Sequence, residues 1–198
     1  MYRIASLNGL CRAPLGIFVA FAVHFLSACN PSLNWRETRI ADTDLTAMMP
    51  CKPAHHQRSV PLAGLTVTLH MTACDADGAS FAIAHATIPD ASAAPQVLAQ
   101  WRKTTLANMA ATSVTDVAES PLPASSLAAS SSPLSAANLS PLPGSLRATA
   151  QGKRGDGSPV HLQGVWFARG PQVFHAAVYA PIVTPDMTDT YFSGLKFQ

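Results

Sequence analysis

The residues whose type most directly suggests chemistry are two cysteines, Cys51 and Cys74. Cys51 and Cys74 could be joined by a disulfide, or they could stay free and bind a metal as thiolates. Metal-binding thiols usually occur in a Cys-x-x-Cys spacing, which neither cysteine has, so the sequence favours the disulfide. A disulfide also requires an oxidising compartment, and the start of the chain bears on that question.

Histidine is the other residue type that could bind a metal, and such a site needs several ring nitrogens on one surface. The hairpins predicted below place His70 and His85 on opposite faces of a sheet, and His161 and His175 on opposite faces as well. We therefore predict no metal site, and we expect His175 to pack beside Trp166. The histidines beyond residue 30 are His55, His56, His70, His85, His161 and His175.

Paired aspartates could provide acid–base chemistry, but their neighbours indicate turns instead. Asp75 and Asp77 precede Gly78, and Arg154-Gly155-Asp156 is most simply the start of a hairpin turn. The sequence contains no Gly-x-Ser-x-Gly elbow, Walker loop or dinucleotide fingerprint. We expect no catalytic residue and no cofactor.

The first 28 residues have the features of an export signal. Arg3 and Arg12 precede an apolar run from Leu15 to Ala28, which is shorter than the ~20 residues of a membrane-spanning helix. The run ends in Leu26-Ser27-Ala28-Cys29, which resembles the lipobox of bacterial lipoproteins. An ordinary signal peptide with a cysteine near its end is the alternative interpretation.

The lipobox resemblance implies that Cys29 is acylated and that residues 1–28 are removed. Each buried CH₂ of an acyl chain contributes ~0.8 kcal/mol, so several chains would anchor the protein to a membrane, facing the periplasm. Asn30 stands where lipoproteins kept at the inner membrane often have Asp, which favours the outer membrane. Residues 29–34 would then be a tether.

Export makes the Cys51–Cys74 disulfide the expected state, and the disulfide constrains the fold. We predict a strand before each cysteine, over 45–49 and over 65–74. Ten residues of strand span ~33 Å, so a simple hairpin of these two strands would hold the cysteines far apart. The disulfide therefore predicts that residues 52–63 run back along the sheet.

The strand over 65–74 is the clearest element, because Leu, Val and Met alternate there with Thr and His. We predict a turn centred on Asp77 and a return strand over 80–88. This register places Phe81 and Ile83 on the Leu/Val/Met face, which we expect to be core, and leaves the other face thinly covered or solvated. Residues 54–61 are predicted to be a polar loop.

The remaining elements follow from periodicity and from turn residues. Residues 118–145 are rich in Ser, Pro and Ala and predict a disordered insertion. The element order predicts one α+β domain over 35–198, with a mostly antiparallel sheet of about six strands packed by one long and one short helix. The further predicted elements are a helix over 93–111 that buries Trp101, strands over 146–153, 159–169 and 172–183, and a helix from Thr184 to about Gly194.

Five segments of the chain resemble a group of small proteobacterial lipoproteins whose outline is similar to the PsbP-like α/β/α sandwich. The resemblance covers most of residues 26–115 and 146–198, and it implies a fold without an activity. PsbP-like domains are mostly binding or assembly modules. The matching segments are the lipobox, Met49-Pro50-Cys51-Lys52-Pro53, Leu62-Ala63-Gly64, Cys74 to Phe81, and Tyr191-Phe192-Ser193-Gly194-Leu195-Lys196.

The composition and net charge of the chain argue against some classes of function. The chain of 198 residues carries a net charge of only +2 and has no cluster of Lys and Arg, so nucleic acid is not an expected partner. We expect a non-enzymatic, lipid-anchored binding or assembly module of the cell envelope, whose partners are the membrane and an envelope protein. A carrier of a small apolar ligand between sheet and helix is the alternative, and an enzyme is a third.

Overall fold

The computed structural model describes residues 32–116 and 145–198 of the chain. The predicted signal peptide, the predicted lipidation site Cys29 and half of the predicted tether at 29–34 lie outside the described residues. The predicted insertion at 118–145 also lies outside them, except for Ser145.

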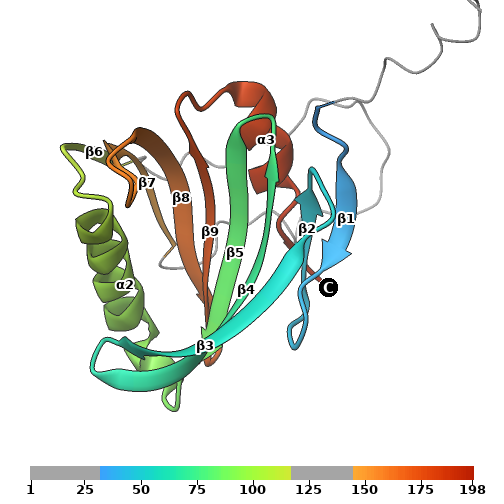
Figure 1. The fold of residues 1–198 in the computed structure, drawn as a ribbon. Helices are drawn as coiled ribbons and strands as arrows, with labels where there is room; N and C mark the ends of the chain where they lie inside the picture. Colours follow the sequence, from blue (N-terminus) through green and yellow to red (C-terminus); the bar gives the residue numbers. More distant parts are fainter. Residues whose placement is uncertain (1–31, 117–144) are drawn as a thin grey trace, which may run out of the picture. The chain divides into compact units, whose positions relative to one another are not determined.

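The described residues form an α+β fold with two antiparallel sheets, which confirms the predicted fold class. The larger sheet has seven strands in the order β3-β4-β5-β9-β8-β7-β6, and the smaller sheet has the order β1-β2-β10 (Figure 1). The strands are β1 (Arg36–Arg39), β2 (Leu45–Met49), β3 (Ala54–Leu62), β4 (Leu65–Ala76), β5 (Ala79–Thr87), β6 (Ser113–Asp116), β7 (Leu146–Lys153), β8 (Pro159–Arg169), β9 (Gln172–Ala180) and β10 (Lys196–Phe197).

The helices begin and end close to the predicted positions. A short 3₁₀ turn, η2 (Ala91–Ala93), is capped by the Asp90 carboxylate, which accepts a hydrogen bond from the Ser92 amide at 2.8 Å. It leads into α2 (Ala94–Asn108), and α3 (Pro185–Ser193) begins with a proline, which fits a first helical turn. None of the described helices has the length and apolar character needed to cross a bilayer.

Both faces of the seven-stranded sheet are covered, so the prediction of one thinly covered or solvated face is wrong. On the first face, Val67 and Leu69 of β4 pack with Val97 and Leu98 of α2. On the second face, apolar residues of β5, β8 and β9 pack against the small sheet and α3. The Tyr191 hydroxyl of α3 donates to the carbonyl of Ala82 in β5 at 2.7 Å, which fixes that helix on the sheet.

The β4–β5 register differs from the predicted one by one residue. The turn consists of Asp77 and Gly78, both with positive φ, and Ala76 pairs with Ala79. Phe81 consequently lies opposite Cys74, on the face away from the Leu/Val/Met side of β4. A slip of one residue moves every side chain to the other face, so the predicted positions of Phe81 and Ile83 are wrong.

Candidate functional site

Strand β3 is the most exposed long element of the described chain. The sequence predicted a polar loop over 54–61, but these residues form a strand that pairs along its whole length with β4. The missed signal is the dipeptide Ala63-Gly64, whose two positive φ angles form a tight turn between Leu62 and Leu65. The first six residues of β3 are exposed, and they carry His55, Gln57 and Arg58 among them.

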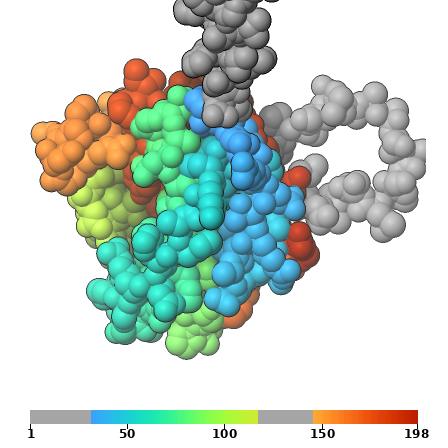
Figure 2. Space-filling view, turned by 45° about the vertical axis from the view of Figure 1, so that its right-hand side comes forward, coloured from blue at the N-terminus to red at the C-terminus, as the bar shows by residue number. Residues whose placement is uncertain are grey.

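The outer edge of β3 is unpaired within the described residues, where β4 is its only neighbour in the sheet. The two-residue turn makes Leu62 and Leu65 a hydrogen-bonded pair, and such pairs recur at every second residue. The amide and carbonyl groups of His55, Gln57 and Ser59 therefore point outward, away from β4. Figure 2 shows the turquoise β3–β4 hairpin on the surface of the molecule. An edge of this kind can pair with an extended chain.

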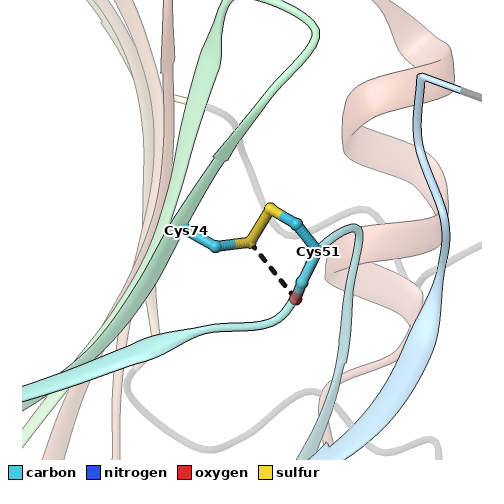
Figure 3. The surroundings of a disulfide bond; sticks show 2 residues. All are labelled: Cys51 and Cys74. Atoms are coloured by element: carbon cyan, nitrogen blue, oxygen red, sulfur yellow. Dashed lines mark hydrogen bonds between the residues drawn. A yellow bond between two sulfur atoms is a disulfide. The ribbon is translucent and has the colours of Figure 1, made fainter.

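The disulfide fixes the start of this edge. Cys51 and Cys74 are joined, with their Cα atoms 6.0 Å apart (Figure 3). Cys51 lies just before β3, and Cys74 follows Ala73, which pairs with Ala54. Residues 54–62 thus run back along β4, as the disulfide required. The carbonyl oxygen of Cys51 lies 3.4 Å from Cys74 Sγ, which is a contact without a donated proton, because a disulfide sulfur carries none.

A groove lies between the end of this hairpin and α2. It has a volume of about 630 Å³, and its lining is more polar on the helix side than on the hairpin side. The lining residues are Pro61, Ala63, Gly64, Gln96, Ala99, Gln100, Lys103 and Thr104. The hairpin and the helix together therefore form a concave surface beside the free edge.

The segments that form β3, η2 and α2 carry basic residues and no acidic ones. Residues 45–74 contain no Asp or Glu, and neither do residues 91–108 of η2 and α2. The same segments carry Lys52, Arg58 and Lys103, whereas Arg102 forms an ion pair with Asp116 of β6. β3, η2 and α2 therefore present cationic and hydrogen-bonding groups and no carboxylate, while the exposed Asp75 of β4 follows Cys74 near the start of β3.

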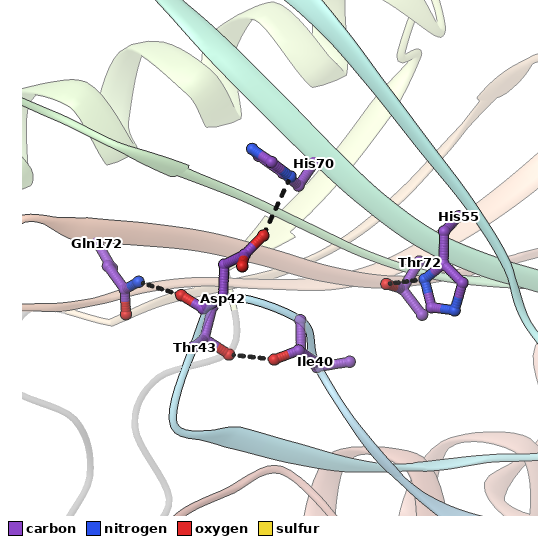
Figure 4. Close-up of polar contacts among 7 residues, drawn as sticks. All are labelled: Ile40, Asp42, Thr43, His55, His70, Thr72 and Gln172. Carbon is purple, nitrogen blue, oxygen red and sulfur yellow. Dashed lines mark hydrogen bonds and ion pairs between the residues drawn. The ribbon is translucent and has the colours of Figure 1, made fainter.

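A stacked pair of histidines lies on the second face of the sheet, which contradicts the predicted separation of His70 and His85. The two residues are direct partners in the β4–β5 ladder, and their ring centroids are 4.9 Å apart. His70 Nδ1 lies 3.8 Å from an Asp42 carboxylate oxygen, and Gln172 donates to the Asp42 carbonyl at 2.9 Å (Figure 4). These contacts hold the β1–β2 loop against the large sheet.

Burial sets the chemistry of this pair. Burial, followed by the charge of His70, lowers the pKa of His85. Asp42 is largely exposed, with 75% of its side chain accessible, so its pairing with His70 is screened by water. No group of three or more His, Cys, Asp or Glu residues in the described part of the chain could hold a metal ion. The contact of His70 with Asp42 attaches the β1–β2 loop to the large sheet.

His175 occupies the opposite face, packed within the core under α2. Its ring stacks on Trp166 at 4.4 Å, which confirms the predicted neighbour, and Trp101 of α2 meets it edge to face at 5.7 Å. Burial lowers the pKa of His175 to about 3. His161 lies five residues from Trp166 along β8 and so faces the other way, as predicted. The three rings fill the space between sheet and helix.

Of the three aspartates predicted to lie in turns, Asp77 and Asp156 do so, whereas Asp75 lies in β4 and pairs with Ser80 of β5, so its prediction as a turn residue is wrong. Asp77 takes a positive φ beside Gly78, and Asp156 accepts hydrogen bonds from the amide and hydroxyl of Ser158 at 2.9 and 2.7 Å. These bonds lower the pKa of Asp156, as expected for a carboxylate that stabilises a turn. The sequence interpretation found these residues and the disulfide but missed the exposed edge.

Comparison with models of protein families finds no match, and comparison with curated proteins finds none either. Among solved structures, the chain is similar to a Pseudomonas aeruginosa protein of unknown function described as a putative regulator. The two share 16% sequence identity, and the match covers 77% of this chain and 85% of that chain with a TM-score of 0.30. At that TM-score, the similarity does not inform the function of this chain.

Proposed function

We propose that this chain is a lipid-anchored, periplasm-facing module of the bacterial envelope that binds or assembles another envelope component through strand β3. The observation that carries the proposal is a nine-residue edge strand whose first six residues are exposed. Free sheet edges bind extended segments of other chains in several protein classes. Soluble proteins usually shorten or cover such edges, because an exposed edge can pair with other chains and cause aggregation. A long exposed edge is therefore a candidate binding site.

Two sequence features support the envelope location. The lipobox resemblance implies a thioether-linked lipid on Cys29, and Asn30 favours the outer membrane. The Cys51–Cys74 disulfide fits an oxidising compartment such as the periplasm. The similarity of the sequence outline to PsbP-like domains, which are mostly binding or assembly modules, supports the same class of role by analogy alone.

A binding role without catalysis fits the geometry better than carriage of a small apolar ligand. A carrier would need space between the sheet and α2, where Trp101, Trp166 and His175 are packed together. The groove beside this core is lined on the helix side by Gln96, Gln100, Lys103 and other residues of α2. These amide and ammonium groups can donate hydrogen bonds to a polypeptide, while Pro61, Ala63 and Ala99 supply apolar contact surface in the same groove.

Site-specific photo-crosslinking in intact cells tests the proposal. A photoreactive amino acid replaces His56 on β3, and in a matched control strain it replaces the exposed Asp189 on α3. We expect a discrete crosslinked envelope component from position 56 and none of that size from position 189. The Cys29→Ser variant should lose both the membrane fractionation and the crosslink.

Two results would contradict the proposal. Identical crosslinking patterns from positions 56 and 189 would mean that β3 has no specific partner. Unchanged processing and membrane fractionation of the Cys29→Ser variant would remove the anchor, and with it the envelope location.

A further inference from the structure

We infer that the outer edge of β3 takes an extended, acidic polypeptide segment, which adds to the seven-stranded sheet as a further strand. This inference rests on the proposed function, because it names the class of partner that the edge binds. It follows from three properties of the described residues: the outward backbone groups, the charges beside them, and the groove that continues the edge.

The backbone fixes where the added strand begins and ends. His55, Gln57 and Ser59 each direct one amide and one carbonyl outward, which is the repeat that a neighbouring strand needs. Pro61 is the next residue of that series and has no amide hydrogen, so the ladder cannot continue through it. The pairing site therefore extends from the disulfide-linked start of β3 to Ser59.

The side chains select for acidic residues. His56 and Arg58 lie on the α2 face of β3, because their ladder partners Met71 and Leu69 lie on that face. Lys103 lines the groove on the same side. A partner with carboxylates on its α2-facing side would meet the Arg58 and Lys103 cations beside the His56 ring, and residues 45–74 and 91–108 place no acidic group there.

The same charges disfavour a second copy of this chain as the occupant. If two β3 strands paired antiparallel around Gln57, the Arg58 of each copy would lie opposite the His56 of the other. No carboxylate on β3 would offset that arrangement. An acidic segment would place carboxylates opposite Arg58, whereas a second copy would leave Arg58 without a counter-charge.

Peptide binding to the full-length protein in detergent tests the inference. The probe is a fluorescein-labelled peptide, Val-Glu-Thr-Glu-Val-Glu-Thr-Glu-Val, which places all its glutamates on one face of a strand. The first control has Lys in place of Glu, and the second is the acidic peptide with alternate backbone amides methylated. We expect the acidic peptide to bind at least ~10-fold more tightly than either control at low salt, and to protect the outward amides of His55, Gln57 and Ser59 from hydrogen exchange.

Two variants separate backbone pairing from charge. Gln57→Pro removes an outward amide, whereas Gln57→Thr retains it and serves as the matched control. We expect the proline variant to lose at least ~10-fold in affinity and the threonine variant to stay within ~2-fold. Arg58→Glu should weaken binding of the acidic peptide several-fold and flatten its salt dependence. This variant tests the inference even if the proline variant does not fold.

Equal binding of the acidic and lysine peptides would overturn the inference, and so would equal binding by the Gln57 variants. A β3-dependent dimer in sedimentation, sensitive to Gln57→Pro, would replace the acidic partner with a second copy. If position 56 crosslinks a specific envelope component while the acidic peptide fails to bind, the inference falls and the proposed function stands. If position 56 crosslinks no specific component and the acidic peptide also fails to bind, both the proposed function and the inference are wrong.

Discussion

Strands β3 and β9 have the same length of nine residues and opposite environments. β9 lies between β5 and β8, so its backbone groups are used on both sides and most of its side chains are buried. Among the described residues, β3 has only β4 beside it, and Leu62 is its only buried residue. The number of neighbouring strands, rather than strand length, therefore separates a core strand from a binding edge.

The histidines of the two strands differ for the same reason. His175 of β9 is enclosed by aromatic rings, and burial lowers its pKa to about 3. His55 of β3 is exposed and forms one hydrogen-bonding contact, from Nδ1 to the Thr72 hydroxyl at 3.1 Å (Figure 4). The same residue type is thus a core ring in one strand and a polar surface group in the other.

Proline substitutions give the largest expected contrast between the two strands. Ala176→Pro in β9 should cost roughly 3 kcal/mol or more in free energy of unfolding, because each amide of a central strand is bonded to a neighbour. Gln57→Pro in β3 should cost less than about 1 kcal/mol, since that amide points away from β4. Denaturant unfolding of both variants measures the difference. Equal losses would show that the outer side of β3 is not free.

Removal of the disulfide should loosen β3 and leave β9 intact. The Cys51→Ser/Cys74→Ser variant should lose about 3 kcal/mol of stability, since the bond closes a loop between residues 23 apart in sequence. Hydrogen exchange should rise in residues 54–60 well before it rises in β9. The control is Ala73→Ser, which adds a neighbouring serine and keeps the bond. Uniform loss of protection across the sheet would contradict this local role.

We expect acid to lower the free energy of unfolding through His175 of β9 rather than through residues of β3. Because His175 titrates at about 3 in the folded state and near 6.5 when unfolded, the unfolded state binds the extra proton between these values. Its contribution is complete above pH 6.5 and is lost as pH falls, by at most about 1.4 kcal/mol per pH unit. His175→Phe should remove that slope, measured by urea unfolding from pH 7 to pH 4.5. An unchanged slope would assign the acid sensitivity elsewhere, for instance to His85, whose pKa is also lowered.

The smallest expected change in stability is the difference between alanine substitutions at two adjacent residues of β3, His55 and His56. His55→Ala should cost about 0.5–1 kcal/mol, because the largely buried Thr72 loses its imidazole partner. His56→Ala should stay within about 0.5 kcal/mol, since the substitution is on an exposed surface. Thermal unfolding at pH 7.5 compares the two variants. A larger loss at His56 would mean that its side chain has a packing role on the α2 face.

The elements were predictable where their signal is local. The alternation over 65–74 predicted β4, and the amphipathic spacing around Trp101 predicted α2. The disulfide, combined with strand dimensions, predicted the reversal of the chain before β4. The turn at Asp77-Gly78 was placed one residue off, and this error alone exchanged the faces of His85 and its strand.

The sequence by itself determined the class of the fold, the positions of both helices and of the long strands other than β3, and the cysteine pair. These properties follow from periodicity and turn chemistry within short windows. Only the tertiary structure decided that both faces of the large sheet are covered, that His70 and His85 stack, and that β3 is an open edge. Those properties depend on which strands become neighbours and in which register. These properties are determined jointly by residues that lie far apart in the chain, so no local sequence pattern predicts them.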